Sequence, residues 1–356
     1  MGTNPSSGPQ VAGVDVLING SPLAASVLRY VEEVTVDDSV ELPSMFSFSV
    51  VSSETLGEET PWVDDNLFSL GNEVEIKMGA SGALTSVIKG EITTLEPEFT
   101  GSRLPVLRVR GYDRRHRLQR GRKTRSFVQS KESDIAKKIA GEAGLSVDAT
   151  DTNTTLDYVL QANQTDWDFL CERAGLVGYE LAFKDEKLLF RPVANNKSAT
   201  ITLSIGVDLL EFFPRLSSSG QVSKVNVKSW SAKDKKAVVS VAQSGDEVSK
   251  MGGQSSAAAL AQSAFGQAIE TVNDRPGGVQ AEGDQLAKGR FNELGLGLIS
   301  GDGLCYGTPQ FRAGIVITIK GVGKRFGGQY YVTSAVHRYT PDRGYLTQFK
   351  VRRSAA

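Results

Sequence analysis

The chain has 356 residues, of which 40% are hydrophobic and 23% charged, and its formal net charge is −1. This length allows two or three domains with substantial cores, and the composition excludes a disordered chain. No stretch approaches the roughly 18 consecutive apolar residues of a membrane helix, and the polar N-terminus lacks a signal-peptide pattern. Two cysteines cannot staple a fold of this size, so we expect assembly in a reducing compartment, the cytoplasm.

The charge is distributed unevenly along the chain. Residues 1–100 hold 16 acidic and 3 basic residues, whereas residues 301–356 hold 9 basic and 2 acidic. An acidic start and a basic end can form complementary faces, either inside one fold or between subunits. The alternative is two solvated surfaces that never meet.

The first third of the chain has the pattern of β-strands. A Ser/Gly/Pro-rich segment (residues 1–12) is expected to be a flexible arm. Apolar and polar residues then alternate with a period of two over Met45–Val50, Gly71–Lys77 and Leu107–Arg110. This period predicts half-buried antiparallel strands, and we assign residues 13–115 to a first β domain.

The apolar period becomes helical near residue 130. Ile135, Ile139 and Ala143 share one helix face, with Ser133 as the expected N-cap and Gly144 as the expected stop. A second helix is predicted from the capping box that begins at Thr165.

The apolar face of this second helix makes a core role more plausible for Cys171 than a nucleophilic one. A hairpin with a turn at Asp185-Glu186 is expected to follow it. Residues 116–195 therefore predict a small α+β domain.

Strands resume in the last part of the chain, residues 196–353, which we expect to form a second β domain. Residues 245–307 interrupt it with 13 of the 37 glycines and two possible helices, 256–270 and 279–294, the second weakened by Gly283 and Gly289. The strands are expected at residues 199–203, 209–213, 222–230, 237–241, 314–320, 328–336 and 344–352.

Three consecutive strands recur with nearly constant spacing. Gly71–Lys77 resembles Gly314–Lys320 in its G-x-x-V/I-x-I-K pattern, Gly90 is matched with Gly328, and Leu107–Arg110 with Phe349–Arg352. Any antiparallel strands can look alike, but the shared order and spacing favour an internal duplication. The fold class predicted is mainly β, with two similar β domains and an α+β insertion.

The sequence offers little chemistry. It contains no P-loop, H-E-x-x-H, C-x-x-C or G-x-S-x-G pattern, and its two histidines, His116 and His337, suit structural roles. We expect no enzyme activity, no cofactor and no metal site.

A basic run covers Arg108–Arg125 and carries nine cations and one acid. Such a run can contact nucleic acid. The interpretation that we favour is a solvated or protein-contacting segment that meets the acidic part of the same or a neighbouring chain, because no nucleic-acid-binding module surrounds it.

Several motifs resemble one known family. Gly111–Leu118 resembles the G-Y-D-x-x-H-x-L signature of the phage late control gene D family, which includes baseplate hub proteins of contractile tails and the hub half of VgrG-type spikes. The segments Tyr158–Leu170, Gly178–Glu180, Leu189–Pro192 and Phe326–His337 are also similar to it. The resemblance covers residues 14–353.

The resemblance implies a homotrimeric hub whose chains each carry two tube-like antiparallel β-barrels. Such a trimer adapts a hexameric tail tube to a trimeric spike and encloses the central channel. The implied partners are the tail tube protein, a separate spike protein and other baseplate proteins, with nucleic acid only as passing cargo. The alternative functions are a glycan-binding module built on residues 116–195 and a cell-wall hydrolase component of a tail.

Candidate inter-subunit contacts come from the basic run and the basic C-terminal strands. They are Arg114, Arg115, Arg117, Arg120, Lys350, Arg352 and Arg353.

Overall fold

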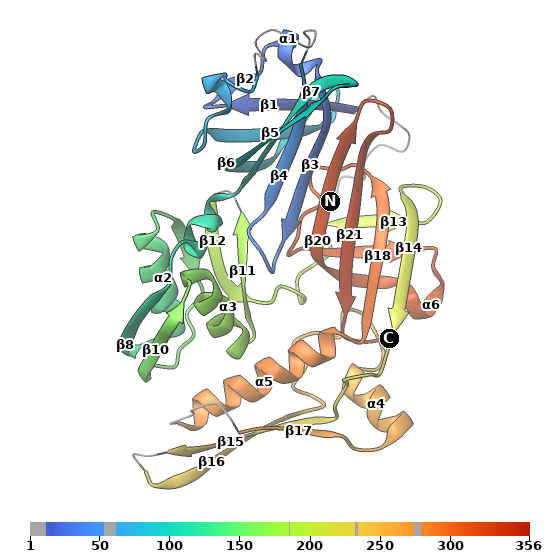
Figure 1. Ribbon diagram of the computed structural model, residues 1–356. Helices are drawn as coiled ribbons and strands as arrows, with labels where there is room; N and C mark the ends of the chain where they lie inside the picture. The colour runs from blue at the N-terminus through green and yellow to red at the C-terminus, as the bar shows by residue number, and fades with distance from the viewer. Residues whose placement is uncertain (1–11, 53–61, 185, 232–233, 274–278) are drawn as a thin grey trace.

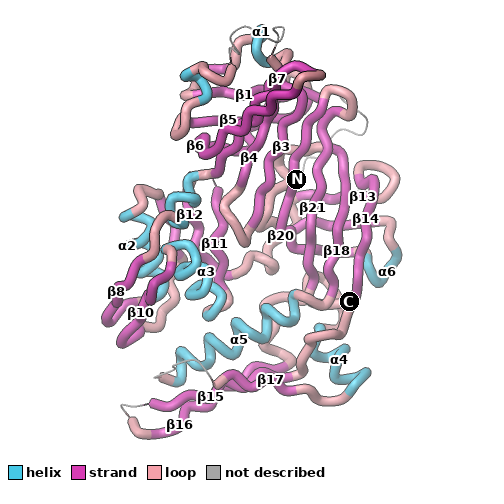
Figure 2. Tube along the Cα trace, viewed as in Figure 1, coloured by secondary structure: helices cyan, strands magenta, loops and turns pink. Residues whose placement is uncertain are grey.

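The computed structural model describes residues 12–52, 62–184, 186–231, 234–273 and 279–356, and it consists mainly of strands (Figures 1 and 2). Thirteen strands form one hydrogen-bonded sheet, and three smaller sheets of two or three strands accompany it. Nearly all of the expected N-terminal arm (residues 1–12) and Asp185 of the expected turn lie outside the described residues. No helix in the described ranges is long and apolar enough to cross a membrane.

The first unit of the large sheet comes from the N-terminal part of the chain. Its side chains alternate in burial as expected, and in the fourth strand Phe46, Phe48 and Val50 all point into the core. The elements are β1 (Ala12–Ile18), β2 (Ser21–Pro22), α1 (Ala25–Leu28), β3 (Val31–Ser39), β4 (Met45–Val51), η1 (Asn66–Phe68), β5 (Glu73–Ala80), β6 (Ala83–Thr100) and β7 (Arg103–Tyr112).

The second unit comes mainly from the C-terminal part of the chain and repeats the strand order of the first. Its elements are β13 (Ile201–Ser204), β14 (Leu209–Leu216), β18 (Ile299–Tyr306), β19 (Val316–Lys320), α6 (Gly323–Phe326), β20 (Gly328–Thr340) and β21 (Gly344–Arg353). The path β14-β18-β21-β20-β19-β13 corresponds strand for strand to β3-β4-β7-β6-β5-β1. The predicted mainly β fold with a repeated β unit is confirmed, although β13 pairs with β19 in parallel and β1 with β5 antiparallel.

Pairing registers show where the two units agree and where they differ. Val74 pairs with Gly90, whereas its counterpart Ile317 pairs with Tyr330. In the β5–β6 and β19–β20 pairs the counterpart of Gly90 is therefore Tyr330. The match of Gly90 with Gly328 is wrong by two residues. A shift of two keeps each side chain on the same face, so the core pattern survives it.

At one pair of corresponding positions the two units fill the core with side chains of different size. Val50 lies opposite Leu107 in the first, and the corresponding pair in the second is Gly303 opposite Phe349. A Cβ atom at Gly303 would lie 2.2 Å from the ring of Phe349, so the phenyl ring takes the space that a valine fills in the first unit.

Gly303→Val is therefore expected to destabilise the folded chain by about 1–3 kcal/mol, because the added side chain overpacks the core. The double variant Gly303→Val/Phe349→Leu installs the Val50–Leu107 pair of the first unit and should recover most of that loss. Urea unfolding of both variants measures the two effects. A single variant as stable as the parent chain would contradict this account of the packing.

One antiparallel junction joins the two units. The second half of β20 pairs with β3, from Ser334 opposite Ser39 to Tyr339 opposite Val34, and Figure 1 shows the two strands side by side. The two β units are therefore parts of a single continuous sheet.

The α+β insertion follows β7. Its elements are η2 (Arg114–Gln119), β8 (Lys123–Ser130), α2 (Glu132–Glu142), β9 (Ser146–Ala149), β10 (Leu156–Gln164), α3 (Asp166–Leu176), β11 (Tyr179–Lys184) and β12 (Lys187–Pro192). The hydroxyl of Thr165 accepts from the Asp168 amide at 3.0 Å, which confirms the capping box of α3. The N-cap expected at Ser133 is wrong: Lys131 holds the cap position, and Ser133 is buried in the first turn of α2.

A third small layer lies beneath the large sheet (Figure 1). It contains β15 (Lys224–Ser231), β16 (Lys236–Gln243), α4 (Ala257–Phe265), β17 (Ile269–Val272) and α5 (Gln280–Leu296). Both glycines that were expected to weaken α5 have packing reasons. A Cβ at Gly283 would lie 2.5 Å from Ser240 Oγ, and one at Gly289 would lie 2.8 Å from the backbone nitrogen of Gly178.

Candidate assembly surfaces

The Gly111–Leu118 motif forms a buried joint at the end of β7. Gly111 passes so close to Phe46 that a Cβ would lie 2.4 Å from its ring. Asp113 caps η2 by accepting from the Arg115 amide at 2.8 Å, and its carboxylate also binds the Arg115 guanidinium, with Nη2 2.7 Å from Oδ2. Arg115 is fully buried, which is tolerated because its charge is paired.

This joint contacts the α+β insertion directly and is linked to the second β unit through Ser44 and Asp38. The Arg115 guanidinium lies 5.2 Å from the ring centroid of Phe183 in the α+β insertion, and it donates to Ser44 Oγ at 2.8 Å. Ser44 Oγ donates to Asp38 at 2.7 Å, and Arg312 of the second β unit donates to the same Asp38 at 2.8 Å. Burial opposes ionisation of Asp38, but Arg312 and Arg115 outweigh it and lower its pKa, so the network is ionic.

The two arginines of the basic run on β7 pair with glutamates of β6, whereas Lys123 and Arg125 pair with Glu142 and Asp166 of the insertion. Across β6 and β7, Arg110 lies 3.2 Å from Glu96 and Arg108 lies 3.7 Å from Glu98. These cross-strand pairs satisfy much of the local acidic charge within the chain. The structure thus gives the basic run a protein partner in the same chain, the interpretation favoured above.

Three side chains of η2 surround the carboxylate of Glu91, which lies on β6. His116 Nε2 lies 2.9 Å from its carboxylate, Arg117 binds it through a bidentate pair, and Arg114 Nε lies 3.6 Å away. Burial raises the pKa of Glu91, but hydrogen bonds from Arg117 and His116 have the larger combined effect. The pKa of Glu91 therefore lies below its usual value.

The predicted inter-subunit cations fall into two groups. Arg115 and Arg353 are buried, and Arg353 donates to the Gly327 carbonyl at 2.9 Å and lies 5.5 Å from the Tyr330 ring. We therefore correct their assignment, because buried side chains offer no surface to a second chain.

The second group reaches the surface. Arg114 and Arg117 are partly exposed but paired as described, and Arg352 lies 3.4 Å from Glu41. Arg120 and Lys350 are exposed. These five remain candidate contacts.

The acidic and basic ends of the chain meet within one fold. Arg338 of β20 lies 2.8 Å from Glu33 of β3, and Arg312 lies 2.8 Å from Asp38 on the same strand. Sequence reasoning left open whether these faces meet inside the chain or between chains. The described residues show them meeting along the β20–β3 junction.

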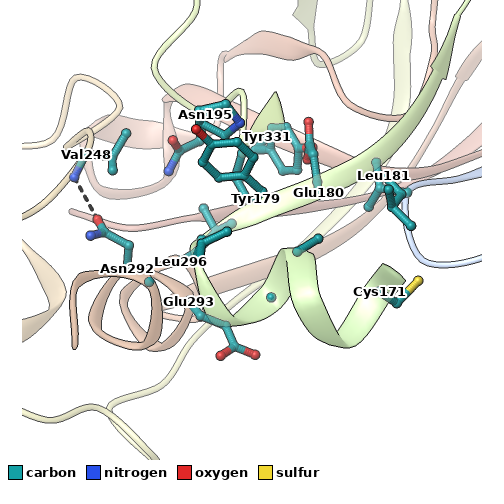
Figure 3. Close-up of a pocket in the computed structure, with 18 of the residues that line it drawn as sticks. Cys171, Tyr179, Glu180, Leu181, Asn195, Val248, Asn292, Glu293, Leu296 and Tyr331 are labelled. Carbon is teal, nitrogen blue, oxygen red and sulfur yellow. Dashed lines mark hydrogen bonds between the residues drawn. The ribbon is translucent and has the colours of Figure 1, made fainter. Parts of the chain in front are cut away.

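A cavity of about 540 Å³ lies between α3, β11, α5 and the β20–β21 hairpin (Figure 3). Glu180 lines it and binds Tyr331 and Arg191, the latter at 2.9 Å. Burial raises the pKa of Glu180 despite these partners. No sequence pattern predicted this contact, because Glu180 and Tyr331 belong to different structural units.

The cysteine that lines the cavity is not an activated nucleophile. Burial and the nearby Asp168 raise the pKa of Cys171 to about 12, so its thiol stays protonated at neutral pH. No group of three or more His, Cys, Asp or Glu side chains within the described ranges is arranged to hold a metal ion.

The free strand edges of the large sheet include β14 and the second half of β6. β14 ends the strand path, and three of its apolar side chains are exposed: Leu210, Phe213 and Leu216. The second half of β6 pairs only with β7, because its pairing with β5 ends at Glu91.

Known structures share this architecture. A 43 kDa tail protein of prophage MuSo2 from Shewanella oneidensis matches with a TM-score of 0.70 at 12% identity, covering 96% of this chain and 98% of that chain. A tail protein from Neisseria meningitidis matches with a TM-score of 0.69 at 14% identity, covering 96% and 97%.

A third match is an Escherichia coli component of the type VI secretion system, described as similar to the T4 tail proteins gp27 and gp5. Its TM-score is 0.59 at 14% identity, covering 95% of this chain and 76% of that chain. The chain therefore has the fold of phage tail and baseplate proteins.

At the level of sequence, the profile of the Alg8 N-terminal domain family matches residues 9–341, so the chain belongs to that family. No curated protein matches it. Membership of the late control gene D family, expected from the motifs, is not confirmed.

Proposed function

We propose that this protein is a structural baseplate hub of a contractile tail or a contractile injection system. Three chains, each with two β units, supply six similar surfaces to a hexameric tail tube and a threefold platform to a spike. The observation that carries the proposal is the repeated strand path, β14-β18-β21-β20-β19-β13 after β3-β4-β7-β6-β5-β1, within one continuous sheet. A closed threefold ring needs this repeat to match sixfold symmetry.

The same proposal assigns no reaction to the chain. Its partners are the tail tube protein, a separate spike protein and other baseplate proteins, and the chain assembles in the cytoplasm before it joins the particle. The tail-protein fold supports these assignments. The network Asp113–Arg115–Ser44–Asp38–Arg312 supports them as well, because it holds the two β units and the insertion in a fixed arrangement.

Native mass spectrometry of the purified chain tests the proposal. The expected mass is three times the 38.2 kDa of the monomer. After mixing with the tube and spike proteins, we expect one trimer for each tube hexamer and each spike. A chain that stays monomeric or dimeric with both partners present would refute the hub assignment.

A further inference from the structure

Within the described residues the β20–β3 junction has no counterpart, although the repeat predicts one. The first half of β20 pairs with β19 and its second half pairs with β3. In the repeat, β6 corresponds to β20 and β14 corresponds to β3. The first half of β6 pairs with β5, as expected, but in the described residues its second half has no strand on that side.

We infer that the second half of β6 pairs with β14 of a second copy of this chain, in the manner of β20 with β3. This inference rests on the proposed trimer and specifies how its subunits meet. Sheet edges with unpaired backbone groups are ready sites for strand addition. Three such junctions alternate with three β20–β3 junctions around a closed ring of six β units.

The repeat also fixes the register of the new junction. Val336 lies opposite Asp37 in the β20–β3 junction. Strand pairing within each unit makes Glu98 the counterpart of Val336, and Ser217 the counterpart of Asp37. Glu98 of one copy is therefore expected opposite Ser217 of the next copy.

This register brings exposed apolar side chains together. Phe99 is 62% exposed and falls opposite Leu216 of the next copy, which is 39% exposed. Covering such side chains favours association. Pro97 and Pro214 lie on the same two strands and lack an N–H, so the junction depends more on apolar contact than β20–β3 does.

The two edges lie at opposite margins of the chain, with β14 at one side of the large sheet and β6 in the unit at the other side (Figure 1). The contact is therefore head-to-tail, and head-to-tail contacts close into rings when the rotation per subunit fits.

Cysteine cross-linking tests the register. The double variant Glu98→Cys/Ser217→Cys is oxidised and analysed on a non-reducing gel, where disulfide-linked dimers and trimers are expected. The matched control Ser39→Cys/Ser334→Cys places cysteines on an observed pair of the β20–β3 junction and should give a disulfide within one chain. A mismatched pair, Glu98→Cys/Leu210→Cys, should give none, because bridged Cα atoms lie within about 7 Å of each other.

The native cysteines should not interfere. Cys305 is buried with a raised pKa, and the pKa of Cys171 is about 12, so both thiols react slowly.

A charge on β6 provides the second measurement. Phe99→Asp is expected to weaken self-association at least tenfold while leaving the melting temperature of the monomer unchanged, because the Phe99 side chain is exposed in the single chain and falls opposite Leu216 of the next copy. Phe265→Asp is the matched control: Phe265 is 78% exposed at the end of α4 and belongs to neither β6 nor β14.

The possible results separate the two proposals. A trimer that forms no cross-link with Glu98→Cys/Ser217→Cys and tolerates Phe99→Asp overturns this junction but leaves the hub function intact. A chain that is monomeric with tube and spike present overturns both.

Discussion

Arg115→Met is expected to destabilise the folded chain by about 3–5 kcal/mol. Arg115 is fully buried and binds the buried Asp113 carboxylate, so removing the guanidinium leaves that carboxylate in the core without its cation. The variant also removes the donor to Ser44, which links Asp113 to the Asp38–Arg312 pair. The effect therefore reaches the contact between the two β units.

Urea unfolding measures this loss, with the fluorescence of Trp167 as a local probe, because the Trp167 ring centroid lies 5.7 Å from the Arg115 guanidinium. Arg120→Met is the matched control, since Arg120 is exposed, and its effect should stay within about 0.5 kcal/mol. Asp113→Asn combined with Arg115→Met should recover part of the loss, because it removes the uncompensated charge. Equal stability of Arg115→Met and Arg120→Met would show that the joint does not hold the units together.

Stability is also expected to fall by about 3 kcal/mol as the pH drops from 6.5 to 4, because of His337 alone. Burial, followed by the nearby positive Arg312, lowers the pKa of His337 from 6.5 to about 4. The neutral ring is held by the Tyr345 hydroxyl 2.7 Å from Nδ1. Below pH 6.5 the unfolded chain binds a proton at His337 that the folded chain does not bind. The loss of stability therefore grows until the pH reaches the pKa of His337 in the folded chain.

His337→Asn isolates this contribution. Asparagine keeps an acceptor for Tyr345 but does not titrate, so the variant should be less stable at pH 7.5 yet lose less stability on acidification. The measured quantity is the difference in unfolding free energy between parent and variant at several pH values from 7.5 to 4. A difference that stays constant across this range would contradict a buried neutral His337.

Local patterns predicted local structure well. The alternation at Met45–Val50 became β4, and the capping box at Thr165 began α3, because strand faces and helix caps depend on residues close in sequence. Ser133 failed as a cap because its side chain is buried against the insertion's core, and tertiary packing then decided the helix start.

Contacts between distant segments could not be predicted. The basic run was visible in the sequence, but its pairing depends on which strands become neighbours, as for Arg108 with Glu98 of β6. Asp38 and Arg312 lie 274 positions apart, with no motif around either. The duplication was visible, whereas its two-residue shift and the parallel β13–β19 pair follow from how each unit closes.

The β20–β3 junction also has a mechanical consequence. The two strands run antiparallel and share six paired positions, so a force along them loads the backbone hydrogen bonds together and does not peel them one at a time. Tension applied to one β unit is transmitted to the other through covalent chain and hydrogen bonds, with little stretching of soft linkers. The chain can therefore transmit a mechanical load while its two β units keep their relative positions.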